Sequence, residues 1–523
     1  MNLQEKKEKF EQGFGVPEFT PVEQKGFLCG SIRGHKGFDQ EVYSPIYKNG
    51  KPVYLGKYPL MTAGQAEECL KVAEEAWDGG LGTWPMMTYK ERIETVRKFA
   101  AEMGKCREKV VKLLMWEICK SEKDAVSEFD RTIDYILDSC NKLEELVKQW
   151  EPIETSDFYL SAGFAIKTGR FPRGITLVMG PSNYPLNETF TTLIPALLMG
   201  NIVLFKPAKV GVLLLEPLLE CFVSCFPFGV VSTLYGEGGT VISPIVRSGK
   251  LAVFAFIGSS RVADIIYQQI PNPHQTKQIL GLGAKNPGII LPGCDIENAV
   301  KHNIKGALSY NGQRCTAHKV LFVHQSIAFE FIEKFVSEVN NLHPGFPWTH
   351  GVSLTPVLPD TTGWFQDLLS DAKARGACIM NENGGEVYGG YMHPAVLYPV
   401  NAQMQLYRTE QFGPLVPIVP FEDIEEIIEY MKTSQYGQQA AIFAGKNERD
   451  TLKVFLNRAK NLVCRVNINT SCQRGPDEVA FTGRKDSAAG TLDLTSALLE
   501  FSIEGVVSVP EGDETYFIDL GNE

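Results

Sequence analysis

The stretch Ile175-Thr176-Leu177-Val178-Met179-Gly180-Pro181-Ser182-Asn183-Tyr184-Pro185 decides the fold class of this chain. Its first five residues are apolar or β-branched and predict a buried strand, and the Gly- and Pro-containing segment after them predicts a turn. An apolar helix is expected to follow, to about Met199. A strand, a tight turn and a helix in this order form the repeating unit of a parallel sheet covered by helices.

The same alternation continues along the chain. Further apolar strands are predicted at 202–205, 230–234 and 252–256, with a helix at 212–226 and another that begins near Gly239. Short apolar strands separated by helices indicate a parallel, doubly wound sheet that is covered on both faces. Ligands of such sheets bind beyond the carboxyl ends of the strands. Binding residues are therefore expected in the loops at 180–185, 206–209 and 257–260.

A second region of the same kind follows Gln278. Its predicted elements are a strand at 289–291, a helix at 296–308, a strand at 320–323 and a helix at 327–342. Two such units in series predict an α/β fold with two Rossmann-like lobes.

Two further segments carry strand patterns outside the lobes. Short alternating pieces at 158–160 and 164–168 predict a β-hairpin, and a last strand is expected at 502–509, suited to pairing with another subunit.

Bulk composition excludes several classes of protein. The net charge of -11 over 523 residues leaves no basic stripe for nucleic acid. The 12 cysteines include no C-x-x-C pair, which indicates a reducing compartment and no metal site. The most apolar region, 191–231, is interrupted by charged residues and cannot span a membrane, and the polar N-terminus resembles no targeting signal. A cytoplasmic protein is expected.

A candidate nucleophile lies in the polar segment Asn311-Gly312-Gln313-Arg314-Cys315-Thr316-Ala317. Most cysteines in globular proteins are inert small hydrophobes. The neighbouring Arg314, however, places a permanent cation beside the sulfur of Cys315, which favours the reactive thiolate. We therefore expect Cys315 to be a nucleophile, and Arg314 to acidify it.

Asn183 stands in the first turn, between Pro181 and Pro185. A side-chain amide held by a rigid turn is suited to donate a hydrogen bond to an oxyanion. The alternative is that Asn183 stabilises only its own turn.

Lys206 and Lys209 follow the second strand, about where a Rossmann protein places an acid for the ribose 2′-hydroxyl. Cations there suit a 2′-phosphate, so NADP is the expected cofactor and NAD the alternative. Solvated surface lysines are the other interpretation. No G-x-G-x-x-G fingerprint is present at the first strand-to-helix turn.

Six motifs in a fixed order resemble the aldehyde dehydrogenase superfamily, over residues 55–509. They are Pro181-x-Asn183-Tyr184-Pro185, Phe205-Lys206-Pro207, Phe256-x-Gly258-Ser259, Leu282-Gly283-x-Lys285-Asn286, Gly312-Gln313-x-Cys315 and Glu410-x-Phe412-Gly413-Pro414. The resemblance implies that Cys315 is the nucleophile and that Asn183 and the Cys315 backbone N–H bind the oxyanion. It also implies that Lys206 and Ser259 contact the cofactor, with Glu410 and Phe412 at the nicotinamide ribose.

Within the superfamily, the chain most resembles the NADP-dependent, non-phosphorylating glyceraldehyde-3-phosphate dehydrogenases. The segment Gln473-Arg474-Gly475-Pro476-Asp477 and the sequence around Cys315 carry this likeness. That group binds its substrate phosphate through residues that match Arg131, Tyr184, Arg314 and Arg474. Guanidinium groups from separate segments suit a dianion, so the expected substrate is a small anionic aldehyde, glyceraldehyde 3-phosphate above all.

One position departs from the family motif Glu-Leu-Gly-Gly-Lys. Gly281 stands where the family has the glutamate that activates water for thioester hydrolysis. Because a positioned base contributes roughly 10²- to 10⁴-fold in rate, deacylation is expected to be slow. Two alternatives stay open. One is a CoA-acylating semialdehyde dehydrogenase, a group that resembles this chain in lacking the acid; the other is a catalytically impaired member kept for binding or assembly.

The resemblance also implies a division of the chain. Residues 1–156 and 174–284 are expected to form a cofactor-binding domain, and residues 285–490 a catalytic domain. Residues 157–173 and 491–523 are expected to form a β-hairpin oligomerisation arm and its partner. A homodimer or homotetramer is therefore expected.

Overall fold

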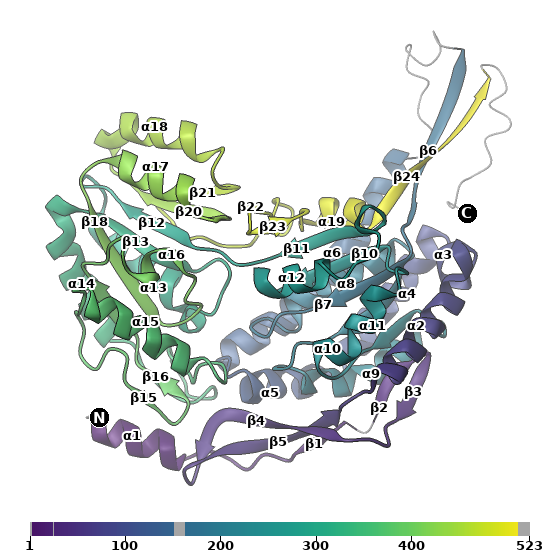
Figure 1. Ribbon diagram of the computed structural model, residues 1–523, viewed down its shortest axis with the longest axis horizontal. Helices are drawn as coiled ribbons and strands as arrows, with labels where there is room; N and C mark the ends of the chain where they lie inside the picture. Colours follow the sequence, from purple (N-terminus) through teal and green to yellow (C-terminus); the bar gives the residue numbers. More distant parts are fainter. Residues whose placement is uncertain (1–2, 25, 151–162, 511–523) are drawn as a thin grey trace.

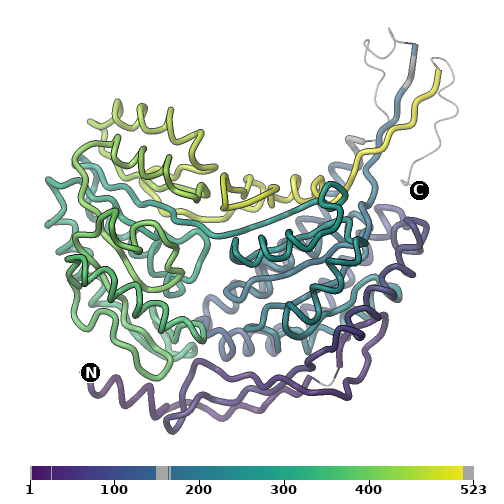
Figure 2. The backbone as a smooth tube through the Cα atoms, in the orientation of Figure 1, coloured from purple at the N-terminus to yellow at the C-terminus, as the bar shows by residue number. Residues whose placement is uncertain are grey.

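Two twisted β-sheets, each flanked by helices, make up the body of the molecule (Figure 1). The computed structural model describes residues 3–24, 26–150 and 163–510. The tube in Figure 2 shows that the chain completes the first lobe before it enters the second, and that its C-terminal part returns across both. The predicted arrangement of two α/β lobes is confirmed.

The first sheet has the strand order β23-β11-β10-β7-β8-β9-β2-β3. Its parallel centre consists of β7 (Ile175–Met179), β8 (Ile202–Lys206), β9 (Val231–Thr233), β10 (Val253–Ile257) and β11 (Lys277–Gly281). The antiparallel edge strands are β2 (Gly26–Cys29), β3 (Ser31–Gly34) and β23 (Ala488–Ala489). The predicted strands are therefore present, with ends that differ by one or two residues.

Helices cover both faces of this sheet. They include α2 (Ala63–Trp77), α3 (Thr83–Met86), α4 (Tyr89–Gly104), α5 (Arg107–Glu117), α6 (Glu122–Trp150), α8 (Asn187–Leu198), α9 (Leu219–Cys225), α10 (Gly238–Val241), α11 (Ser243–Arg247), α12 (Ser260–Tyr267) and α19 (Leu494–Glu500). The helix predicted at 212–226 begins instead as a 3-10 helix, Leu213–Leu218. Pro217 lies inside it and cannot donate the backbone hydrogen bond of an α-helix.

The second sheet has the order β14-β17-β18-β13-β12-β20-β21. Its strands are β12 (Asn286–Ile290), β13 (His318–His324), β14 (Cys378–Ile379), β17 (Ala395–Tyr398), β18 (Leu415–Phe421), β20 (Gln439–Phe443) and β21 (Arg465–Ile468). The flanking helices are α13 (Ile296–Leu308), α14 (Ala328–Asn340), α15 (Thr362–Ala374), α16 (Gln405–Arg408), α17 (Ile424–Thr433) and α18 (Arg449–Ala459). Small ribbons are formed by β15 (Val387–Tyr388) with β16 (Tyr391–Met392) and by β19 (Tyr436–Gly437) with β22 (Arg484–Lys485).

The N-terminal segment runs along one side of the body (Figure 1). It contains α1 (Leu3–Gln12), β1 (Val22–Glu23), β4 (Asp39–Lys48) and β5 (Lys51–Pro59). The sequence carried no clear signal for this part of the chain.

A two-stranded arm projects from the first lobe (Figure 1). It pairs β6 (Phe164–Pro172) with β24 (Ser502–Pro510) in antiparallel register, from Phe164 opposite Pro510 to Pro172 opposite Ser502. The final strand is thus confirmed, and its partner within the chain is β6. The first half of the predicted hairpin, 158–160, lies outside the described residues. The domain boundaries themselves stay a prediction.

Candidate active site

A cavity of about 830 Å³ lies between the two lobes. The carboxyl ends of β7, β8, β10 and β11 face it from the first lobe, and the segments that lead into β13 and β18 face it from the second. All of the site residues predicted from the sequence line this one cavity. They are Arg131, Asn183, Tyr184, Lys206, Lys209, Ser259, Arg314, Cys315, Glu410, Phe412 and Arg474. The expected loops at 180–185, 206–209 and 257–260 therefore meet at one place.

Cys315 lies three residues before β13, in a loop held by side chains from several segments. Asn286 Nδ2 and Lys319 Nζ donate to the Cys315 carbonyl at 2.9 and 2.8 Å. Asn183 Nδ2 donates to the Gln313 carbonyl at 2.8 Å, which links the first lobe directly to the cysteine loop. An amide carries two N–H donors, and only one of those on Asn183 is used by the described residues.

The charges around the thiol differ from the expectation. Burial raises the pKa of the Cys315 thiol, and Glu188 raises it further, while Lys319 and Arg474 lower it. The prediction that Arg314 acidifies Cys315 was wrong, because the pKa of the thiol is raised and the cations that oppose the rise are Lys319 and Arg474. Arg314 Nη2 instead donates to the carbonyls of Lys305 and Gly306, at 3.1 and 3.0 Å. These belong to the last turn of α13, whose carbonyls lack partners within the helix.

The turn that carries Asn183 and Tyr184 rests on a buried ion pair. Lys120 and Glu128 pair with each other, and the side chains of both are inaccessible to solvent. Glu128 Oε1 accepts from the backbone N–H groups of Leu186 and Asn187 at 3.1 and 3.2 Å. The Lys120 ammonium lies 3.1 Å from the centre of the Tyr184 ring, in a cation–π contact. This pair fixes the strand-to-helix turn from behind.

The two lysines after β8 differ in their surroundings. Burial lowers the pKa of Lys206, whose Nζ donates to the Pro207 carbonyl at 3.2 Å, whereas Lys209 is exposed. The loop after them is anchored by the buried Glu117, which accepts from the N–H groups of residues 211–213 at 2.8 to 3.0 Å. Burial raises the pKa of Glu117 to about 7, although the three N–H groups oppose this shift.

Ser259 is the N-cap of α12, and its side chain accepts from the Val262 N–H at 3.4 Å. It brings a helix N-terminus to the wall of the cavity, and such a terminus favours anions. Together with Lys206 and Lys209, this donor set fits the phosphates of a dinucleotide.

Glu410 contacts the segment that crosses from one lobe to the other. Its Oε1 accepts from the Ala284 N–H at 3.1 Å and pairs with Lys319 Nζ at 2.7 Å. Lys319 also lies 5.6 Å from the centre of the Phe412 ring. One buried ammonium thus connects Glu410, Phe412 and the carbonyl of Cys315.

Gly281 ends β11 and lines the cavity together with Cys315. Its φ angle is not in the left-handed region, and an added Cβ would meet nothing closer than Ile257 Cγ1 at 3.4 Å. The backbone at this position therefore accommodates a side chain, although the sequence supplies none.

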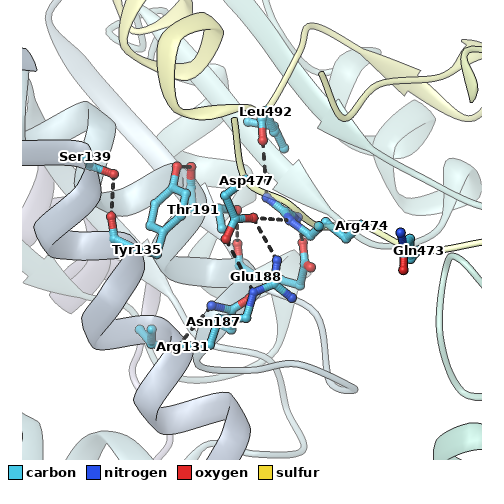
Figure 3. A network of polar contacts seen from close by, with 12 residues as sticks. Arg131, Tyr135, Ser139, Asn187, Glu188, Thr191, Gln473, Arg474, Asp477 and Leu492 are labelled. Carbon is cyan, nitrogen blue, oxygen red and sulfur yellow. Dashed lines mark hydrogen bonds and ion pairs between the residues drawn. The ribbon is translucent and has the colours of Figure 1, made fainter. Parts of the chain in front are cut away.

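The arginines predicted for a substrate anion are partly occupied by carboxylates (Figure 3). Arg131 Nη2 pairs with Asp477 at 2.7 Å, and Arg474 pairs with Glu188 and faces Asp477 at 3.6 Å. Burial opposes the charge of Arg474, but the two carboxylates outweigh it, so the pKa of Arg474 is raised. The assignment of these two residues to the substrate anion stays a prediction, and an anion would have to compete with these carboxylates. Arg314 differs, because no carboxylate of the described residues lies within salt-bridge distance of it, and its buried Nε, like that of Arg474, has no hydrogen-bond partner among them.

Sequence reasoning missed Glu188, Lys319, Lys120 and Glu128. A signal was present for Glu188, since it is the single acid in the otherwise uncharged segment 183–198. Lys319 gave none, because its partner Glu410 lies in a distant segment. Lys120 and Glu128 are close in sequence, but nothing in the local pattern indicates that their ion pair is buried. Within the described parts of the chain, no group of three or more His, Cys, Asp or Glu side chains is arranged to hold a metal ion. No helix in those parts is both long and apolar enough to cross a bilayer.

Several known proteins are similar to this chain in sequence and in fold. Residues 35–505 match the model of the aldehyde dehydrogenase family. The chain is 32% identical over 471 residues to the NADP-dependent glyceraldehyde-3-phosphate dehydrogenase of Streptococcus equinus, covering 89% of this chain and 94% of that protein. The enzyme of the same name from Arabidopsis thaliana is 30% identical over 424 residues, covering 80% and 82%. The NADP-dependent glyceraldehyde-3-phosphate dehydrogenase of Bacillus halodurans, solved with NADP, matches with a TM-score of 0.83 at 27% identity, covering 93% and 99%.

Proposed function

Since this chain belongs to the aldehyde dehydrogenase family, we propose that it oxidises a small anionic aldehyde to the acid with NADP, through a thioester on Cys315. Glyceraldehyde 3-phosphate is the proposed substrate, because the relatives from Streptococcus equinus and Arabidopsis thaliana are named for it. The observation that carries the proposal is the single cavity that gathers Cys315, Asn183, the two lysines and the arginines.

The first step needs a nucleophile and a site for the developing oxyanion. The Cys315 thiolate attacks the carbonyl carbon, a C–S bond forms, and the carbonyl π electrons move to oxygen. The second N–H of the Asn183 amide and the backbone N–H of Cys315 are the donors for that oxygen; neither donates a hydrogen bond to another described residue. Preorganised donors of this kind contribute roughly 3 kcal/mol each to lowering a barrier.

Lys206, Lys209 and the N-terminus of α12 at Ser259 would hold the cofactor phosphates, with Glu410 and Phe412 beside the nicotinamide ribose. When bound, NADP supplies the hydride acceptor for the aldehyde carbon. The cationic end of β8 favours the 2′-phosphate of NADP over the free hydroxyl of NAD.

The anionic group of the substrate would lie against Arg314, Tyr184, Arg131 and Arg474. Arg314 supports this assignment best, because it has no carboxylate partner among the described residues, whereas Arg131 and Arg474 already pair with carboxylates.

A direct assay tests the substrate. NADPH formation is measured with glyceraldehyde 3-phosphate and with glyceraldehyde, using Cys315→Ser as the inactive control. We expect a higher kcat/KM for the phosphorylated aldehyde and no activity in the control. Equal kcat/KM values for the two aldehydes would refute the anionic substrate, and activity in Cys315→Ser would refute the nucleophile.

Release of the acyl group by hydrolysis is the step that lacks its usual residue, because Gly281 replaces the glutamate of the family motif. Without a carboxylate at Gly281, we expect a burst of about one NADPH per site and then slow turnover. The same observation favours a second candidate function, acyl transfer to coenzyme A, because a thiol acceptor makes a water-activating base unnecessary. Coenzyme A added during the slow phase distinguishes hydrolysis of the thioester from acyl transfer. A faster rate of NADPH formation supports acyl transfer, and an unchanged rate refutes it and supports hydrolysis.

We also propose that the β6–β24 arm joins subunits of a homodimer or homotetramer. Ile503 and Val506 of β24 are 52% and 59% exposed, so the arm presents two aliphatic side chains that a second subunit could cover. Replacing both by Ser should shift the mass measured by light scattering toward the monomer. An unchanged mass would exclude the arm as the subunit contact.

A further inference from the structure

Glu188 is a buried carboxylate in the wall of the substrate cavity. It is the second residue of α8, only 8% exposed, and pairs across the lobes with Arg474 (Figure 3). Its other carboxylate oxygen, Oε1, accepts no hydrogen bond from the described residues. A buried charge of this kind is costly unless it is paired. Glu188 and Arg474 therefore hold each other in place.

The charges of Arg131 and Arg474 are balanced by carboxylates, which leaves the charge of Arg314 as the unbalanced one in the anion-binding group. Arg131 and Arg474 contribute two positive charges, and Glu188 and Asp477 contribute two negative charges within salt-bridge distance of them. A dianion placed there would meet the Glu188 carboxylate together with the guanidinium groups. Glu188 is also the charge that most raises the pKa of the Cys315 thiol, which places its carboxylate near the reacting sulfur.

We infer that Glu188 is a specificity-determining residue, an internal counter-ion that occupies Arg474 and that an anionic substrate must displace. The inference rests on the proposed function and deepens it. Because like charges repel in a site of low dielectric, Glu188 lowers the preference for dianionic over uncharged aldehydes. Arg314, which has no carboxylate partner among the described residues, then provides most of the attraction for the anion.

The first test needs no catalytic activity. Inorganic phosphate protects Cys315 from iodoacetamide when it occupies the cavity, and the Cys315 peptide is quantified by mass spectrometry with NADP present. We expect Glu188→Gln to bind phosphate at least about tenfold more tightly than the wild type, since Gln keeps the shape and removes the charge. Glu410→Gln removes the cavity's other lining carboxylate, which pairs with Lys319 instead. Equal tightening by both variants, or none by Glu188→Gln, would overturn the inference.

The double variant Glu188→Gln/Arg474→Gln provides a second test that does not depend on the folding of the single variant. Removing both partners of a buried pair is tolerated better than removing one. If Arg474 is already occupied, the double variant binds phosphate within about threefold of the wild type. A tenfold loss would show that Arg474 is available to anions in the wild type and would refute the inference.

Kinetics separate this inference from the proposed function. In Glu188→Gln, the KM for glyceraldehyde 3-phosphate should fall relative to that for glyceraldehyde, with similar kcat values for both. A wild type that oxidises neither aldehyde refutes the proposed function, whereas the phosphate titration still decides the role of Glu188.

Discussion

Gly281→Glu would place a carboxylate at the position where the family has its water-activating base. The substitution introduces no backbone strain, because φ at Gly281 is outside the left-handed region. The new Cβ would meet Ile257 Cγ1 at 3.4 Å, an ordinary van der Waals contact. The neighbouring Gly283 offers no such space, since a Cβ there would lie 2.8 Å from Glu410 Oε2.

The expected gain follows from the chemistry of the slow step. A positioned general base accelerates hydrolysis by roughly 10²- to 10⁴-fold, which corresponds to about 3 to 5 kcal/mol of barrier. Stopped-flow measurement of NADPH should show a burst and slow turnover in the wild type. In Gly281→Glu, the steady-state rate of NADPH formation should rise by about 10²-fold or more. The time course should then be linear, without a burst.

Gly281→Gln is the matched control, because it adds the same volume without a base. We expect it to keep the burst and the slow phase. The reasoning is refuted if the wild type shows no burst and Gly281→Glu turns over no faster, since another residue would then already activate water. It is also refuted if Gln accelerates turnover as much as Glu.

Three further predictions follow from the charges of the site. Lys209→Ala should raise the KM for NADP about tenfold and leave that for NAD unchanged; parallel changes in both would remove Lys209 from 2′-phosphate recognition. Because only the thiolate is alkylated, the iodoacetamide rate at Cys315 should rise with a midpoint above pH 9.0, and Glu188→Gln should move that midpoint down; a wild-type midpoint well below 9.0 contradicts this. Lys120→Met leaves Glu128 buried and unpaired, so the free energy of unfolding in urea should fall by about 3 to 5 kcal/mol; a loss under about 1 kcal/mol would mean that Glu128 takes up a proton or finds another partner.

Much of the fold follows from local pattern. The run of apolar residues at 175–179 is buried throughout and forms β7, and the helix predicted at 296–308 appears with those bounds. The N-terminal strands β4 and β5 escaped prediction because they pair with each other through irregular register over a long hairpin. The apolar periodicity that begins at Lys90 is divided between two helices, α4 and α5, since Gly104, a poor helix former, ends α4.

For the candidate active site as well, some features could be predicted from the sequence and others could not. Strand-end position and residue type pointed to Asn183, Lys206 and Lys209, since parallel strands deliver their carboxyl-end loops to one edge. The resemblance to the aldehyde dehydrogenases supplied Ser259, Glu410, Phe412 and the substrate-binding residues Arg131, Tyr184 and Arg474. The position of the Arg314 side chain could not be predicted from the sequence. Its place next to Cys315 in the sequence suggested a cation beside the sulfur, yet its guanidinium reaches the end of α13. Neighbours in sequence often point away from each other, and burial raises the pKa of a thiol whatever residue precedes it.

The sequence by itself determined the two-lobed α/β fold and indicated Cys315 as the candidate nucleophile and Asn183 as the candidate oxyanion donor. These depend on periodicity and on residue type, which are local properties, whereas the missing acid at Gly281 is visible only by comparison with the family motif. Only the tertiary structure decided which charges meet. Glu188 and Arg474 are 286 residues apart in sequence, and their pairing requires that the segment after β21 lie against the start of α8. Electrostatic interactions depend on distance and burial in space, and that is why the charge balance of the substrate site became visible only in the folded chain.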